Sequence, residues 1–244
     1  MPRDVTSVVE LSITPLDQYY YVSRESGDRF STKPYIMHSA LFYALGLLPT
    51  RFRVSEQTPE YTTHYKQSEA ARGIYIHPAT IVGGGRHMTR RFSVKGDTYR
   101  SEAQQENKNL LETGHQRTYE PDIQFRTFVT CDGGTDALAF AQQLPSYIRV
   151  GKKMTSARLE TDVHDVTPKE GQFTLDQPVG KQDISTDEYD ILGSVRMESM
   201  APVDLLTQSD LSGQYVRVDA QFGPEKNDTG ITLPTDVYFL GTDQ

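Results

Sequence analysis

Residues 145–153 read PSYIRVGKK, a short run in which polar and apolar side chains alternate before a glycine and two lysines. The alternation predicts a strand over Tyr147–Val150, and the proline before it ends a short helix that we expect over Asp136–Leu144. The charge of the chain changes sign just after this stretch. Residues 1–158 hold 20 basic and 16 acidic side chains, whereas residues 159–244 hold 5 and 17. A basic-leaning front portion in a chain of net charge −8 indicates a phosphate-binding surface.

Three further elements are predicted on the N-terminal side of this strand. Val5–Thr14 alternates cleanly, which is typical of a half-buried strand with Glu10 and Ser12 on its polar side. Apolar residues at helical spacing predict one long helix over Pro34–Leu48, with the proline in its first turn. Alternation over Ile123–Thr130 predicts another strand.

The order strand, helix, long insertion, strand, helix, strand is that of a βαββαβ unit whose second strand lies inside the insertion. We therefore expect an α+β fold with a ferredoxin-like, RNA-recognition-like domain over residues 1–158. Residues 159–244 are rich in β-branched residues and acidic turns, and they predict an acidic, β-rich C-terminal subdomain. Its clearest strands are expected at Val216–Val218 and Val237–Leu240.

Composition excludes several classes of protein. No apolar run reaches the 18 or so residues that cross a bilayer, and the N-terminus lacks the layout of a signal peptide. Cys131 is the single cysteine, so no internal disulfide forms and we expect it to be a buried, small apolar residue. The six histidines match no zinc motif, and no nucleophile elbow or dinucleotide fingerprint is present. We therefore expect a cytoplasmic protein without cofactor or metal.

Two basic clusters are candidate phosphate-binding sites. The first comprises Arg149, Gly151, Lys152 and Lys153, where the glycine lets the backbone approach a phosphate and the cations supply charge without base preference. An ordinary solvated turn with surface lysines would have the same residues. The second cluster follows three glycines and interleaves aromatic residues, as RNA-contacting loops do; its basic residues include Arg86, Arg90, Arg91 and Lys95. A charged loop without a partner is the alternative.

A third candidate group lies after the first strand. Tyr20, with the tyrosines on either side of it, and Arg24 precede the helix that contains His38. Exposed aromatic residues on a strand of an RNA-recognition fold stack on bases, although alternate tyrosines can equally belong to the core. His38, one of these tyrosines and Lys152 could also supply the base and the cation of a metal-independent RNA cleavage site.

Four segments in the same order resemble a known family: Tyr21–Glu25, Thr32–Leu47, Gly73–Ala79 and Tyr147–Lys153. They are similar to the type I-D CRISPR Cascade subunit called Csc-one, the type I-D member of the Cas-five group in the RAMP superfamily. The resemblance covers roughly residues 6–158. It implies an RNA-recognition-like RAMP domain with a protruding thumb at about residues 80–118, and a β-rich C-terminal part.

The resemblance also implies a function. Such subunits cap the 5′ handle of the crRNA beside the Cascade large subunit and the backbone RAMP subunits, in a complex that recognises target DNA near the protospacer-adjacent motif. We therefore expect a non-catalytic RNA-binding and assembly subunit whose first cluster holds handle phosphates and whose second contacts the guide or the nearby duplex. Two alternatives stay open: an endoribonuclease that processes the guide precursor, and an acidic protein-interaction domain without a nucleic-acid role.

Overall fold

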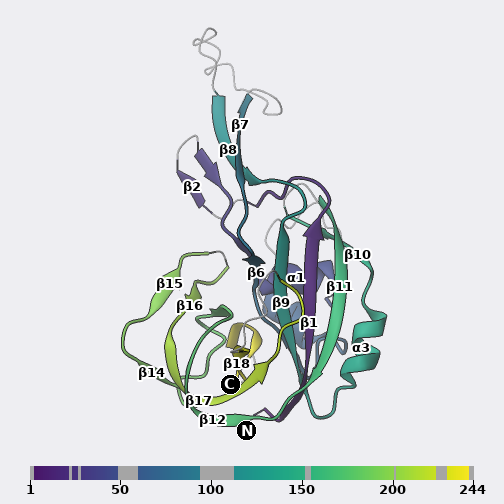
Figure 1. The fold of residues 1–244 in the computed structure, drawn as a ribbon, viewed down its shortest axis with the longest axis vertical. Helices are drawn as coiled ribbons and strands as arrows, with labels where there is room; N and C mark the ends of the chain where they lie inside the picture. The colour runs from purple at the N-terminus through teal and green to yellow at the C-terminus, as the bar shows by residue number, and fades with distance from the viewer. Residues whose placement is uncertain are drawn as a thin grey trace.

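The computed structural model describes residues 3–21, 24–26, 29–48, 60–93, 113–151, 155–200, 202–223 and 230–241. The fold is mostly β with few helices, an α+β arrangement (Figure 1). Its centre is a seven-stranded sheet, and two smaller sheets and a projecting four-stranded ribbon surround it. Among the described residues, no helix is long and apolar enough to cross a membrane.

The central strand of the main sheet is β1 (Val5–Pro15), which pairs antiparallel with β11 (Thr155–Asp165) and with β9 (Gln124–Asp132). Outward from these strands the sheet continues with β10 (Tyr147–Val150) at one edge, and with β5 (Ile74–Ile76), β6 (Ala79–Val82) and β4 (Tyr35–Ile36) on the other side. The strand predicted over Tyr147–Val150 is confirmed, but it is an edge strand. The strand that pairs with β1 is its hairpin partner β11.

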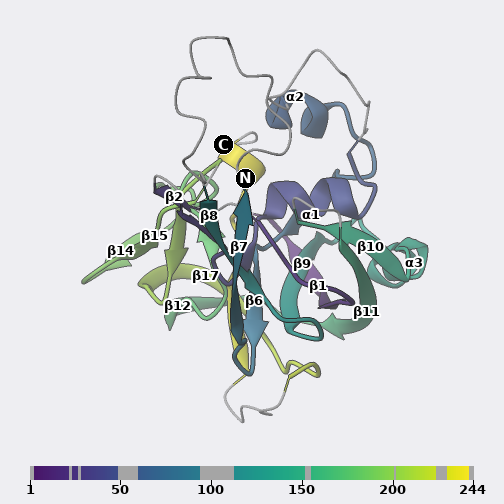
Figure 2. The ribbon, with the colours of Figure 1, turned by 90° about the horizontal axis from the view of Figure 1, so that it is seen from above.

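The helices α1 (His38–Ala44) and α3 (Ala137–Gln143) pack on one face of this sheet, in a core shared with alternate residues of β1. Figure 2 shows α1 beside β9 and β1, with the C-terminal strands grouped on the other flank. The helix predicted over Pro34–Leu48 is wrong in length. Tyr35–Ile36 instead pairs with Ala79–Thr80 as a strand, because that pairing satisfies its backbone groups. Gly46, at φ 75°, ends α1 in a Schellman motif.

The prediction that β1 is half-buried is also wrong, because both of its faces are covered. The polar face includes Glu10 and Ser12, and both have 0% exposure. C-terminal strands cover this face: Val8 packs with Val216 and Leu233. The polar side of the strand is therefore an internal interface between the main sheet and the C-terminal part.

The C-terminal part contains two small antiparallel sheets. One is built on β17 (Asp210–Val218) with β12 (Lys169–Thr174), β14 (Asp190–Leu192) and β18 (Ile231–Pro234), and the other joins β13 (Val179–Gly180), β16 (Leu205–Thr207) and β15 (Arg196–Glu198). The strand predicted at Val216–Val218 is confirmed. The strand predicted over Val237–Leu240 is wrong, since Val237 forms one isolated bridge and Phe239–Gly241 is a 3₁₀ turn. The border expected after residue 158 falls inside β11, a central strand of the main sheet.

The insertion contains more regular structure than its sequence indicates. It holds α2 (Tyr61–Lys66), β5 and β6, and then the hairpin of β7 (His87–Ser93) and β8 (Thr113–Tyr119). Beside β8 run β3 (Arg29–Ser31) and β2 (Arg24–Ser26), which complete a ribbon in the order β2-β3-β8-β7. Figure 1 shows this ribbon standing away from the body of the protein.

Candidate nucleic-acid interface

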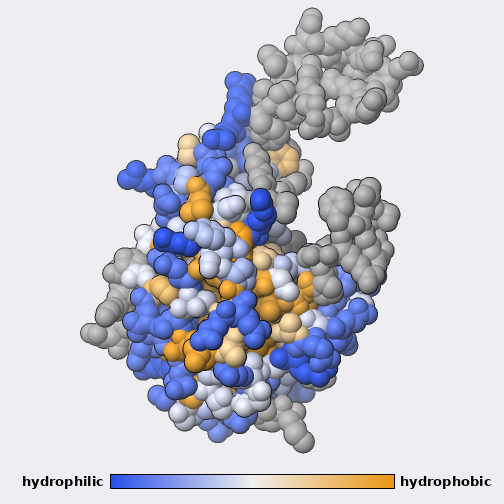
Figure 3. Space-filling view, turned by 90° about the vertical axis from the view of Figure 1, so that its right-hand side faces the viewer, coloured by the Kyte–Doolittle hydropathy of each residue, from blue (hydrophilic) through white to orange (hydrophobic). Residues whose placement is uncertain are grey.

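A groove of about 870 Å³ lies between α1 and the edge strand β10. Its walls are residues of α1 and of β10, and its floor comes from the segment after β1; the lining side chains include Tyr19, Tyr21, Met37, Ala40, Tyr43, Tyr147, Arg149 and Gly151. Of the lining residues that the structure describes, none is acidic and none belongs to residues 159–244. Figure 3 views the molecule from the side of β10, where apolar surface gathers among hydrophilic side chains.

Contacts of two tyrosine hydroxyls hold the floor and the helix wall of the groove in place. The hydroxyl of Tyr19 donates to the carbonyl of Tyr35 at 3.2 Å, and its ring meets Phe125 edge-on at 4.9 Å. Burial raises the pKa of Tyr19, so this phenol stays neutral. On the helix wall, the hydroxyl of Tyr43 lies 2.6 Å from Nδ1 of His64. These two rings therefore form a fixed surface.

On the strand wall, Tyr147 and Arg149 are exposed to solvent. The alternate residues, Ile148 and Val150, are buried. Strand alternation causes this pattern, since residues two apart point to the same side. Gly151 then turns the chain at φ 76°. A Cβ at this position would lie 2.6 Å from the carbonyl oxygen of Tyr20, so only glycine allows the turn to pack so closely on the floor.

Of the predicted residues in the first cluster, Arg149 and Gly151 lie together in the groove. Lys152 and Lys153 lie outside the described residues, as does Lys95 of the second cluster. Arg24 is on β2, and its side chain lies outside the described part of the chain.

Tyr20 does not face the groove. It is 8% exposed and lines a second hollow of about 340 Å³ at the base of the projecting ribbon, together with Arg90 and Gln116. Ser156 of β11 lines both hollows, which therefore adjoin. The neighbouring tyrosines at positions 19 and 21 are the ones that reach the groove, because successive side chains in an extended segment point to opposite sides.

His38 also faces away from the groove, since its side chain has 0% exposure. Its Nε2 lies 3.1 Å from a carboxylate oxygen of Asp183, which also accepts a hydrogen bond from the hydroxyl of Tyr75 at 2.6 Å. Burial opposes ionisation of Asp183, but the charge and hydrogen bond of His38, together with the other donors, outweigh it and lower the pKa of this carboxyl. The prediction that His38 contacts RNA is therefore corrected: the residue is part of the interior.

The hairpin β7–β8 presents a separate group of exposed cations. Arg90 and Arg91 are exposed on β7, and Arg86 is exposed just before that strand. In the register of the hairpin, Arg91 lies opposite His115 and Thr89 lies opposite Arg117, so these side chains share one face. Within the described ranges none of the arginines at 86, 90, 91 and 117 forms an ion pair, which leaves their charges available to a polyanion.

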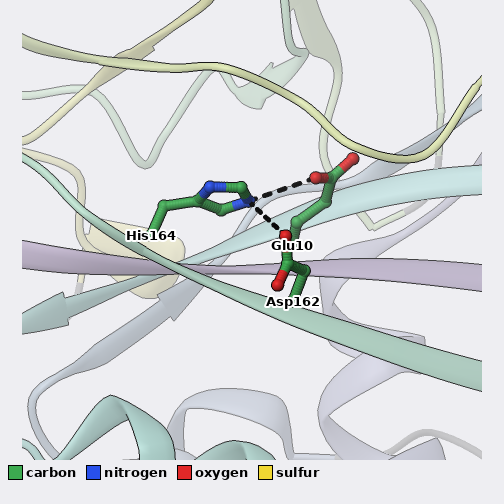
Figure 4. Close-up of side chains that lie close together, drawn as sticks. All are labelled: Glu10, Asp162 and His164. Atoms are coloured by element: carbon green, nitrogen blue, oxygen red, sulfur yellow. Dashed lines mark hydrogen bonds and ion pairs between the residues drawn. The ribbon is translucent and has the colours of Figure 1, made fainter.

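One group of side chains has donor atoms that could hold a metal ion. Glu10, Asp162 and His164 place one ligand atom each within 4.8 Å of one another (Figure 4). Two backbone N–H groups, of Gln221 and Phe222, already donate to the Glu10 carboxylate at 2.7 and 3.1 Å. The buried carboxylate is thus compensated within the fold and fastens the segment after β17 to the main sheet.

His164 completes this cluster as an ion-pair partner. Its Nε2 lies 3.2 Å from Glu10 and 3.6 Å from Asp162. The hydrogen bond to Glu10 raises the pKa of His164, partial burial opposes this, and the charges of Asp162 and Asp219 add to it. When it is protonated, the ring neutralises part of the negative charge that the strands bring together here.

Three residues of these surfaces were not among the predicted site residues: Tyr147, Tyr43 and Arg117. A signal for the first was present, since Tyr147 stands two residues before Arg149 in an alternating strand and must share its side. Tyr43 does not lie on the apolar face of its predicted helix, so the sequence is compatible with a side chain that faces either a groove or solvent. Arg117 depends on the hairpin register, which no local pattern specifies.

Comparison with protein families places the chain among CRISPR-associated proteins. The family model that matches spans residues 6–242 and describes the type I-D CRISPR-associated protein Cas5/Csc1, so the chain belongs to this family. The match extends well beyond residue 158 and includes the acidic C-terminal part.

The chain is also similar in fold to solved structures of CRISPR proteins. One is a chain in the structure of the type III-B Cmr-beta bound to cognate target RNA and AMPPnP, with 13% identity, coverage of 83% of this chain and 86% of that chain, and a TM-score of 0.46. Another is a CRISPR protein from Archaeoglobus fulgidus, with 10% identity, coverage of 93% and 98%, and a TM-score of 0.41. A search of curated proteins finds no match.

Proposed function

We propose that this CRISPR effector subunit is a non-catalytic, RNA-binding component of a type I-D interference complex, acting in the cytoplasm, and that it caps the 5′ handle of the crRNA. The observation that carries the proposal is the groove between α1 and β10, which combines tyrosine rings, Arg149 and a tight glycine turn, with no acidic residue in the described part of its lining. In a chain of net charge −8, a hollow that is lined by an exposed arginine and by no acid among the described residues favours a polyanion.

The topology of the main sheet supports a RAMP-type, RNA-recognition-like domain. Its inner strands follow the order β11-β1-β9-β5/β6 with antiparallel neighbours, and a helix follows the first and the third of these strands in the chain. This order supports the split βαβ arrangement that is typical of ferredoxin-like folds. The projecting β7–β8 hairpin is then the thumb.

The thumb extends the proposed RNA path. The hollow lined by Tyr20 and Arg90 adjoins the groove at Ser156, so a single strand can run from one to the other. We propose that Arg91 and Arg117 on the thumb contact the guide or the target duplex near the protospacer-adjacent motif. Contacts of this kind add charge-dependent affinity without base preference.

The acidic C-terminal part is proposed to face neighbouring proteins, the large subunit and the backbone RAMP subunits. Its described residues do not line the groove, and its edge strands β14 and β15 expose the apolar residues Ile191 and Met197. Exposed apolar side chains on unpaired strand edges are typical of protein contacts.

The endoribonuclease alternative depended on His38 as the base. That side chain is fully buried and engaged with Asp183, so no RNA hydroxyl can reach it in this fold. We therefore do not propose this activity.

The test measures binding of the full chain to a synthetic RNA of the repeat-derived 5′ handle. Fluorescence anisotropy gives the binding constant at several salt concentrations. Arg149→Ala should weaken binding about tenfold and reduce the slope of log K against log salt by about 0.7, since one phosphate contact to a single strand is lost. Arg196→Ala removes an equal charge from the exposed strand β15 and should change neither quantity. Wild-type binding that Arg149→Ala leaves unaltered would refute the proposed site.

A further inference from the structure

We infer that the hollow at the base of the projecting ribbon binds one nucleobase of the guide RNA by its hydrogen-bonding edge, and that Gln116 and Asp17 select the base. This is the hollow of about 340 Å³ that Tyr20 and Arg90 line. The inference rests on the proposed function. It adds that the subunit reads the identity of a base at one position, and not backbone charge alone.

Gln116 of β8 is a buried amide whose donor has no partner. Its side chain is 6% exposed and lines the hollow, and among the described residues its Nε2 forms no hydrogen bond. Buried polar groups in folded proteins are nearly always hydrogen-bonded, so each exception needs an explanation. A ligand in the hollow that accepts a hydrogen bond would supply the missing partner.

The walls of the hollow come from three segments that are bonded to one another. Arg90 lies opposite Gln116 in the register of the β7–β8 hairpin, so the two side chains share one face of the hairpin. Gln18, after β1, joins the other two segments. Its amide donates to Sδ of Met88 on β7 at 3.4 Å, and its carbonyl accepts from the hydroxyl of Thr155 on β11 at 3.0 Å. A hollow held in this way is preorganised, so binding has little to order.

Charge decides which part of a nucleic acid enters the hollow. The lining contains one cation, Arg90, and one anion, Asp17, and neither forms an ion pair with the residues that the structure describes. One oxygen of Asp17 accepts from the N–H of Gln18 at 2.6 Å. A phosphate in the hollow would be repelled by this carboxylate, whereas an uncharged base offers donors to Asp17 and acceptors to Arg90 and Gln116.

The rest of the hairpin favours RNA over a peptide as the source of this uncharged group. Arg91 and Arg117 are exposed on the same hairpin, and Arg86 is exposed just before it. A nucleic-acid strand can place its phosphates near these cations and one base in the neighbouring hollow. The volume agrees with a single base, because it lies near the lower end of the range of about 300–1,000 Å³ for ligand sites.

The residue types predict which bases fit. The exocyclic amino group of adenine, cytosine or guanine can donate to the carboxylate of Asp17, and a neighbouring ring nitrogen or carbonyl oxygen can accept from Nε2 of Gln116. Uracil has no exocyclic amino group. We therefore expect uracil to be the weakest of the four bases at this position.

The experiment measures the affinity of the full chain for a fluorescein-labelled handle RNA and for a series in which each position in turn is abasic. One position should lose about 5- to 150-fold in affinity without its base, the range for one well-formed base contact, and uracil should be the weakest base there. Gln116→Met keeps the size of the side chain and removes its hydrogen-bonding groups, so it should make the abasic change at that position nearly neutral. Asp17→Asn adds a donor and should narrow the difference between uracil and the other bases.

Gln142→Met is the matched control, because Gln142 is exposed on α3 and lines neither hollow. It should leave the affinity for every RNA unchanged. If every abasic RNA binds as the intact RNA does, or if Gln116→Met keeps the wild-type base preference, the hollow does not read a base. Either result overturns this inference and leaves the proposed function standing. If the wild-type chain does not bind handle RNA at all, the proposed function fails and the inference fails with it.

Discussion

The buried contacts of Asp183 should stabilise the whole molecule, and Asp183→Ala tests this. The carboxylate lies in the C-terminal part, yet it accepts hydrogen bonds from Tyr75 of β5 at 2.6 Å and from the backbone N–H of Leu240 at 2.8 Å, and it pairs with His38 of α1 at 3.1 Å. Each of these groups comes from a different element. The substitution therefore removes one acceptor from several buried or half-buried donors.

The expected magnitude follows from the burial of the pair. Both His38 and Asp183 have side chains with 0% exposure, so alanine at 183 leaves an imidazole and a phenol without their partner in the interior. Breaking a buried pair by removing one member costs about 3–5 kcal/mol. For a chain of this size, about 2–4 °C of Tm is lost per kcal/mol, so Tm should fall by about 6–20 °C.

The assay is thermal and urea denaturation of wild type, Asp183→Ala, His38→Ala and the double variant. The double variant should be less destabilised than the sum of the single ones, because the second substitution removes a group that has already lost its partner. Asp187→Ala is the control: it removes an exposed carboxylate from the same part of the chain and should shift Tm by less than about 2 °C. A small loss for Asp183→Ala, or strict additivity in the cycle, would refute the role assigned to this pair.

Three further predictions follow from the same structure. Arg91→Ala/Arg117→Ala should lower the slope of log K against log salt for handle or guide RNA by about 1.4, as two lost phosphate contacts require, and an unchanged slope would remove the thumb from the interface. Gly151→Ala should lower Tm by several degrees and weaken RNA binding, because its Cβ would lie 2.6 Å from a backbone carbonyl oxygen at a positive φ; a variant as stable as wild type would contradict the turn geometry. His164→Gln should remove a pH dependence of stability. Since hydrogen bonding to the neighbouring carboxylate raises the pKa of His164, its contribution is fully present below pH about 6.5 and is lost as the pH rises through the raised pKa. Urea midpoints of the wild type should therefore fall relative to the variant between pH 6 and 9, and parallel pH profiles would show that the ring does not titrate with folding.

Local periodicity of the sequence predicted the strands and helices whose formation does not depend on a distant pairing partner. The strands β1, β9 and β10 and the helix α3 lie close to their expected positions, because alternation and helical spacing act within a few residues. Asp136, predicted as the first residue of this helix, is instead its N-cap, and its carboxylate accepts from the N–H of Ala139 at 3.0 Å. The length of α1 was missed because Tyr35–Ile36 pairs with a strand more than 40 residues later.

The residues of the candidate site were likewise predictable only where a local sequence pattern indicates them. Arg149 and Gly151 form one local signal, and the structure places them in the groove together. His38 was assigned wrongly because its partner Asp183 is 145 positions away in the sequence, and no local pattern indicates such a pairing. Tyr20 lines the adjoining hollow and not the groove, because successive side chains in an extended segment point to opposite sides.

The polar face of β1 explains how an acidic chain can keep acidic side chains out of the described lining of the groove. Glu10 has an alternating position that resembles a solvent-facing one, but two N–H groups 211 and 212 residues later bind it and hold the C-terminal part on that face. The opposite face of the same strand packs with α1, the helix that forms a wall of the groove. A buried carboxylate requires hydrogen-bond donors at fixed positions, whereas an apolar side chain can pack in many orientations. The polar residues of β1 therefore select the face on which the acidic part docks, and this leaves the helix side to the groove that Arg149 and Tyr147 line.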